Sequence, residues 1–74
     1  NGALPVNRKR SITIRGHRTS FSIEDEFWEI LKQCATDANQ SVAQMITRVD
    51  TNRDPETNLS SALRLHALKS LTDR

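Results

Sequence analysis

The sequence predicts a mainly α-helical domain with a short β-ribbon near its N-terminus, and three observations lead to that prediction. Residues 11–15 and 20–23 alternate polar and apolar side chains, as strands with one buried face do. Residues 24–38 and 41–52 then carry apolar side chains at the three- and four-residue spacing of amphipathic helices. The chain has 74 residues, which is enough for one domain.

A chain this short has few means of stabilising a monomer. Only 35% of its residues are hydrophobic, and its single cysteine, Cys34, cannot form an intrachain disulfide. Small domains without disulfides or metals usually depend on oligomerisation, so we expect a homodimer. No apolar run approaches the roughly 18 residues of a membrane span. A lone cysteine fits a reducing compartment, so we expect a cytoplasmic protein without membrane contact.

Positive charge is concentrated near the N-terminus. Residues 8–18 carry five basic side chains and no acidic one, whereas the whole chain carries +2, which leaves −3 for the remainder. A basic segment on a mildly acidic body suggests an anionic partner, although a solvated basic arm has the same composition. Residues 1–9 contain Gly2 and Pro5 and no periodicity, so we expect a flexible basic arm followed by a single domain over residues 10–74.

Two short strands are predicted, at residues 11–15 and 18–23. Apolar residues occupy even positions in the first and odd positions in the second, so the phase changes between them, at Gly16-His17. A two-residue loop of type II′ with Gly16 in its first central position would produce this change. In that register one face carries Ile12, Ile14, Thr19 and Phe21, and the other carries Ser11, Thr13, Arg15, Arg18, Ser20 and Ser22.

This hairpin has a cost, and a second geometry remains open. The loop places Arg15 opposite Arg18, a like-charge pair that an anion bound over it would relax. Alternatively, Gly16 is a bulge or break in an irregular arm, and the sequence does not decide between strand and arm for residues 10–16.

Three helices are predicted after the strands, at residues 24–38, 41–52 and 58–71. In the first, Ser22 is a candidate cap and Asn39 can take the left-handed terminal conformation. In the second, Ser41 and Gln44 match a capping box, and Pro55 bars continuation. The third starts at Asn58 or Thr57, and its apolar residues spread widely around the axis. The apolar stripes of the first two helices are Phe27, Ile30, Leu31, Cys34, Ala35 and Ala38, and Val42, Met45, Ile46 and Val49. Trp28, off the first stripe, is expected to flank the core or meet a partner.

A strand, a helix and a Ser-capped second helix in this order resemble the ribbon-helix-helix family, the MetJ/Arc type of DNA-binding dimer. The resemblance covers residues 18–50: the strand Arg-Thr-Ser-Phe-Ser-Ile, the first apolar stripe, and Ser-Val-x-x-Met-Ile-x-x-Val from Ser41 to Val49. The segments Arg-Gly-His-Arg-Thr-Ser at 15–20 and Asn-Leu-Ser-Ser-Ala-Leu-Arg at 58–64 resemble a bacterial subfamily with an extra N-terminal strand and an extra C-terminal helix.

The resemblance implies a dimer in which two copies of the 18–23 strand pair antiparallel. The outward residues Arg18, Ser20 and Ser22 would then contact base edges in the major groove of double-stranded DNA. The implied phosphate contacts are the start of the second helix and the basic residues: Ser41, Val42, Arg8, Lys9, Arg10 and Arg15. The implied dimer core is Phe21, Ile23, Phe27, Ile30, Leu31, Met45, Ile46 and Val49.

These residues predict a transcriptional regulator, with an alternative on the same dimer fold. If residues 11–15 pair as well, a dimer presents four strands, which is wider than the groove admits. The alternative is therefore a protein-interaction module or antitoxin-like protein that binds a partner through helix 58–71. An enzyme is not predicted, since no nucleophile, base and acid set and no Gly-rich phosphate loop is present. No cofactor or metal is expected, because His17 and His66 lack a second ligand at metal spacing.

Overall fold

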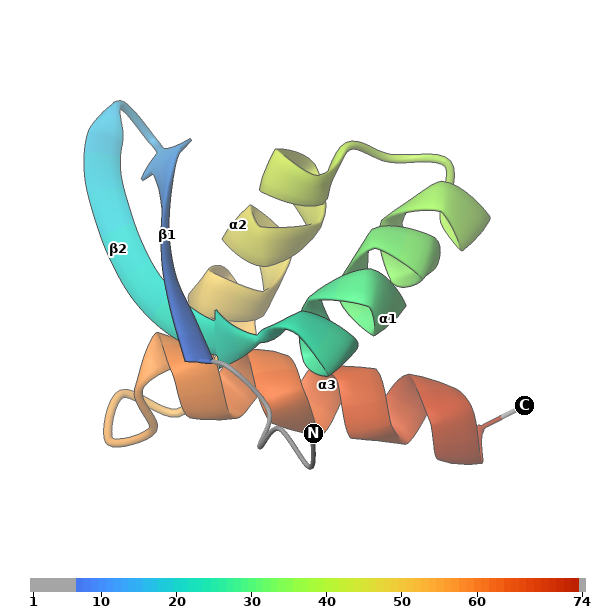
Figure 1. Cartoon of the computed structure of the whole chain (residues 1–74). Helices are drawn as coiled ribbons and strands as arrows, with labels where there is room; N and C mark the ends of the chain where they lie inside the picture. The colour runs from blue at the N-terminus through green and yellow to red at the C-terminus, as the bar shows by residue number, and fades with distance from the viewer. Residues whose placement is uncertain (1–6, 74) are drawn as a thin grey trace.

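The computed structural model describes residues 7–73, which form a β-hairpin followed by three helices (Figure 1). The elements are β1 (Asn7–Ile14), β2 (His17–Glu24), α1 (Asp25–Asp37), α2 (Val42–Asn52) and α3 (Leu59–Thr72). In Figure 1, α3 runs beneath the hairpin and the other two helices. The predicted fold class, a short ribbon followed by helices, is confirmed. The arm expected at residues 1–9 lies outside the described residues as far as residue 6, whereas residues 7–9 belong to β1.

The hairpin turn differs from the one expected. Its loop is Arg15 and Gly16, both with positive φ (51° and 81°), as in a type I′ turn. The register pairs Ile14 with His17, so the predicted loop at Gly16-His17 was wrong by one position, and each cross-strand pair is displaced by two residues. Side chains alternate with a period of two, so this displacement leaves every strand residue on its expected face. Arg15 moves into the loop, and the like-charge pair with Arg18 does not form.

The inner face of the hairpin packs on all three helices. Its side chains Ile14, Phe21 and Ile23 join residues of α1, α2 and α3 in one core. The helical members of that core are Leu31 and Ala35, then Met45 and Ile46, then Leu59, Leu63 and Ala67. Phe27, Trp28, Ile30, Val42 and Val49 pack against it and are half-buried. A single chain therefore covers most of the residues that the resemblance assigned to a dimer core, because α3 supplies a third helical layer.

Capping residues set the helix ends. The Ser41 hydroxyl accepts a hydrogen bond from the Gln44 N–H at 3.0 Å, and the Gln44 side chain accepts one from the Ser41 N–H at 2.8 Å, so the capping box is confirmed. Asn58 caps α3 by accepting the Ser61 N–H at 2.8 Å. The cap expected at Ser22 was wrong, because β2 continues through Glu24, which precedes α1 without a side-chain cap bond.

The chain turns after α1 as expected, but the first stripe is less buried than expected. Asn39 has a φ of 58°, the left-handed conformation predicted for it. Leu31 and Ala35 are buried, whereas Cys34 is half-buried and Ala38 is exposed. The end of α1 therefore turns away from the core.

Two contacts tie the end of β2 to α3. The Ser22 N–H donates to the Ser60 hydroxyl at 3.2 Å. The Arg64 guanidinium donates two hydrogen bonds to the Glu24 carboxylate, of 2.8 and 3.1 Å. These charge-assisted bonds hold the pKa of Glu24 below its ordinary value. The strand and the third helix are thus joined by a bidentate ion pair next to the core.

Replacing Gly16 tests the turn. A Cβ at Gly16 would meet no atom within 4 Å, so Gly16→Ala causes no steric clash. Its only cost is that alanine must adopt a positive φ. We expect a loss of about 1–2 kcal/mol in the free energy of unfolding. The control His17→Ala, in the adjacent exposed strand position, should change it by only a few tenths. Urea unfolding measures both, and equal stability of the two variants would contradict the turn described here.

The Glu24–Arg64 pair makes stability depend on pH. Because the folded pKa of Glu24 lies below the unfolded value near 4.5, the pair stabilises the protein fully above that value and is lost as pH falls through the folded pKa. Between about pH 7 and about pH 3, the wild type should therefore lose more stability than Glu24→Gln. Glu56→Gln, at an exposed acid, is the matched control. If the difference in free energy of unfolding between the wild type and Glu24→Gln stays constant with pH, the ionisation of Glu24 does not contribute to stability and the prediction is wrong.

Candidate nucleic-acid interface

The outer face of the hairpin turns away from the helices and carries only polar side chains. Alternation places four residues of each strand on it, and the three rungs nearest the turn pair Thr13 with Arg18, Ser11 with Ser20, and Lys9 with Ser22. We call these six residues the outer face. Five of them are exposed, and Ser22 is half-buried because α3 lies beside it. The hydroxyl oxygens of Ser11 and Ser20 lie 3.3 Å apart at the centre of the face.

Two cations stand on the outer face without an internal partner. Within residues 7–73, Lys9 and Arg18 enter no ion pair and no side-chain hydrogen bond. The neighbouring acid, Glu24, is already neutralised by Arg64. Arg18 lies near the turn and Lys9 near the other end, so both ends of the face present a positive charge with hydroxyl groups between them.

The other two cations of β1 point toward the helices and are engaged. Arg8 Nε lies 3.0 Å from one oxygen of Asp25, and Arg10 Nη2 lies 2.8 Å from the other. The Arg10 guanidinium also stacks 4.4 Å from the centre of the Trp28 ring, and its side chain is only 22% exposed. Its Nε is buried with no hydrogen-bond partner among the described residues. Arg10 therefore helps to hold β1 on α1, with Trp28 flanking the core as expected.

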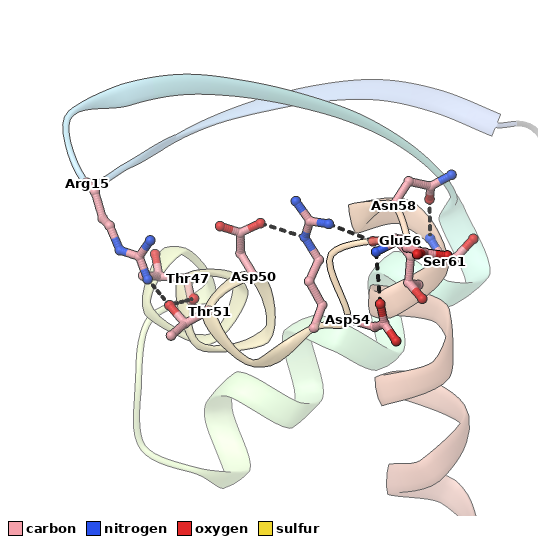
Figure 2. Close-up of polar contacts among 10 residues, drawn as sticks. Arg15, Thr47, Asp50, Thr51, Asp54, Glu56, Asn58 and Ser61 are labelled. Carbon is pink, nitrogen blue, oxygen red and sulfur yellow. Dashed lines mark hydrogen bonds and ion pairs between the residues drawn. The ribbon is translucent and has the colours of Figure 1, made fainter.

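Arg15 anchors the tip of the hairpin to α2. Its guanidinium donates to the Thr51 hydroxyl, which in turn donates to the Thr47 carbonyl at 2.9 Å (Figure 2). Figure 2 shows the Arg15 side chain reaching from the turn down to the helix. Although Arg15 is exposed, its first partner is within the protein, and the two-residue turn is held over the last turns of α2.

The start of α2, the expected phosphate clamp, lies apart from this anchor. At 1.5 Å per residue, Ser41 is roughly 15 Å along the helix from the Thr51 contact. The capping box already uses the Ser41 hydroxyl, but the N–H groups of Val42 and Ala43 take part in none of the hydrogen bonds found in residues 7–73. These two groups are those that a helix N-terminus offers to an anion.

Sequence reasoning named the β2 half of the outer face as candidate base-reading residues, and from the β1 half it named only Lys9, as a phosphate contact. It placed Ser11 and Thr13 on the polar face but named neither as a site residue, and it treated Lys9 as part of an arm. The signal was present in the alternation of Lys9, Ser11 and Thr13, which continues the strand pattern toward the N-terminus. The role of Trp28 as the platform for Arg10 had no local signal.

A second surface is apolar. Leu65, Leu68 and Leu71 of α3 are 61%, 53% and 46% exposed. Leu65 borders a groove of about 490 Å³ between the three helices, whose apolar wall includes Met45 and Val49. Within the described part of the chain, no cluster of three His, Cys, Asp or Glu side chains could hold a metal ion. None of the helices there is long and apolar enough to cross a membrane.

Comparison with known proteins agrees with this architecture. A search of curated proteins and a search of solved structures each found no match. A family model described as a ribbon-helix-helix domain matches residues 7–71, from the first residue of β1 to within one residue of the end of α3. The match therefore includes the extra strand and the third helix as well as the strand-helix-helix unit, and the chain belongs to the ribbon-helix-helix domain family.

Proposed function

We propose that this protein is a homodimeric DNA-binding regulator that inserts its β-ribbon into the major groove. Ribbon-helix-helix domains are typically found in DNA-binding regulators and are not an enzymatic fold. The observation that carries the proposal is the exposed outer face, on which Arg18 stands without an internal partner. A two-stranded ribbon of this kind fits the major groove, which is about 12 Å wide.

The proposed contacts follow from the chemistry of the side chains. Arg18 can donate two hydrogen bonds to the O6 and N7 atoms of a guanine. Ser20 and Ser22 each offer a hydroxyl that donates or accepts, and so pair with several base edges. Lys9 and the free N–H groups at the start of α2 would contact phosphates, which contribute affinity and no sequence preference.

A second copy of the chain is the proposed partner in the active form. Ribbon-helix-helix proteins generally bind DNA as homodimers, and the exposed leucines of α3 leave apolar surface that a second copy would cover. A dimer with two-fold symmetry would bind two half-sites related by the same symmetry. The lone cysteine and the resemblance to a bacterial subfamily favour action in a bacterial cytoplasm.

Replacing Arg18 tests the proposal. A duplex enriched from a random-sequence pool by the wild type should bind Arg18→Ala more weakly by about 1–3 kcal/mol, with relaxed preference at the contacted base. Lys69→Ala, which removes one positive charge from α3, should leave the preference unchanged. Fluorescence anisotropy with wild-type and single-base-substituted duplexes measures both effects. Failure of the wild type to enrich any sequence, or a preference indifferent to Arg18, would contradict the proposal.

The exposed leucines favour a second candidate, a protein-interaction module that binds through α3. Three large apolar side chains on one helix are unusual on a small monomer surface. In this case the double variant Leu65→Ser/Leu68→Ser should no longer bind the partner protein. Neutralising the basic residues of the hairpin should leave that binding unchanged. Duplex binding that is lost when those basic residues are neutralised supports the DNA-binding proposal instead.

A further inference from the structure

We infer that the groove between the three helices binds an amphipathic helix of a partner protein, one whose polar side is acidic. The inference goes beyond DNA binding and does not depend on it. Within the described part of the chain, the groove is lined by α1, α2, α3 and the segments that connect them, and not by the hairpin. Three features support the inference: the spacing of the residues along the walls, the apolar floor, and the cations on the rim.

The two long walls of the groove are single faces of α2 and α3. The lining residues stand at positions i, i+3, i+4 and i+7 of each helix: Met45, Arg48, Val49 and Asn52 of α2, and Ala62, Leu65, His66 and Lys69 of α3. Each wall therefore follows its helix for two turns, about 10 Å at 1.5 Å per residue. An amphipathic helix that lies in a groove places its anchoring side chains over a similar length, at i, i+3, i+4 and i+7.

The floor of the groove is apolar and narrow side chains leave it open. Met45 and Ala62, which are 1% and 9% exposed, form part of the floor. Cys34 and Ala38, one turn apart on α1, close the third side with small side chains. Leu65 stands in solvent at the border. The recess, of about 490 Å³, thus offers apolar surface that the apolar stripe of a helix would cover.

The rim of the groove is positively charged. Arg48 on α2 and Lys69 on α3 are exposed on opposite walls, and neither forms an ion pair among the described residues. A third lining cation, Arg53, is paired with Asp50 at 2.9 Å. Asp54 is the one acid among the described lining residues. Two unpaired cations on either side of an apolar floor favour an occupant with carboxylates along both edges of its apolar stripe.

Charge also argues against a second copy of this chain as the occupant. Among the described residues, α3 is the helix that leaves large apolar side chains exposed. It carries Arg64 and Lys69 and no acidic residue, so a second α3 in the groove would bring cations to the cationic rim. Leu68 and Leu71 do not line the groove, and they remain available to the second copy proposed above.

The test uses three labelled synthetic peptides, each about 14 residues or four helical turns long. The first carries leucines at helical spacing between glutamates and alanines. The second has lysine in place of every glutamate, and the third has the composition of the first in an order that destroys the leucine stripe. Measured by fluorescence anisotropy on the full chain, the acidic helix should bind at least about tenfold more tightly than either of the others.

Reversing the rim charges tests the electrostatic part of the inference. The double variant Arg48→Glu/Lys69→Glu should weaken binding of the acidic peptide by about tenfold and should strengthen binding of the lysine peptide. The matched control is Lys9→Glu/Arg18→Glu, which changes the net charge by the same amount on the outer face of the hairpin. It should bind the acidic peptide as the wild type does.

Filling the groove tests the location. Ala38 is exposed at the end of α1, so Ala38→Trp places a large side chain in the groove without disturbing the core, and it should block the acidic peptide. Thr36→Trp, at an exposed position of α1 outside the lining, is the matched control and should not. Circular dichroism and thermal unfolding establish that each variant is folded, and light scattering gives its molecular mass.

Each outcome decides the inference separately from the proposed function. Equal binding of the three peptides, or binding that is indifferent to the rim charges, overturns it. A lower molecular mass for Ala38→Trp than for the wild type means that a second copy occupies the groove, and this too overturns it. Binding of the acidic peptide that depends on the rim charges and is blocked by Ala38→Trp, at unchanged mass, supports it. If that result is obtained with a wild type that enriches no duplex, the DNA-binding proposal fails and the present inference stands.

Discussion

The strict alternation of side chains along the β1–β2 hairpin is the constraint on which the rest of the structure depends. It sends Ile14, Phe21 and Ile23 into a core shared with all three helices and leaves a polar face in solvent. The positive φ angles of Arg15 and Gly16 close the hairpin and fix its register. A register displaced by a single residue would have exchanged the two faces, exposing the apolar set and burying the serines.

The third helix changes what one chain can do alone. Leu59, Leu63 and Ala67 complete a core that a strand and two helices would leave open, and Ser60 with Arg64 ties β2 to the same helix. These contacts leave Leu65 and Leu68 outside, on a different side of the helix. One element thus holds the hairpin in position and also exposes apolar side chains on its other side, which explains why its apolar residues spread so widely in the sequence.

Local rules predicted most of the fold, and long-range contacts account for what they missed. The caps at Ser41 and Asn58 and the left-handed Asn39 depend on neighbouring residues, and the sequence displays them directly. The turn was misplaced because two registers that differ by two residues sort the same side chains onto the same faces. The ion pair of Arg10 with Asp25 joins residues that are 15 positions apart in the sequence, and the hydrogen bond from Ser22 to Ser60 joins residues 38 positions apart. No local sequence pattern therefore indicates either contact.

The division of basic residues between the two faces of β1 has a consequence for how the protein would search a genome. Arg8 and Arg10 share the single negative charge of Asp25, whereas Lys9, Arg15 and Arg18 pair with no acid among the described residues, so the field outside the hairpin arises mainly from these three. Affinity for arbitrary sequences grows with the number of phosphates neutralised, and three such cations per hairpin neutralise few. Such a protein would lose little of its population to the vast excess of unrelated DNA, and its occupancy of a target site would rest on the base contacts themselves.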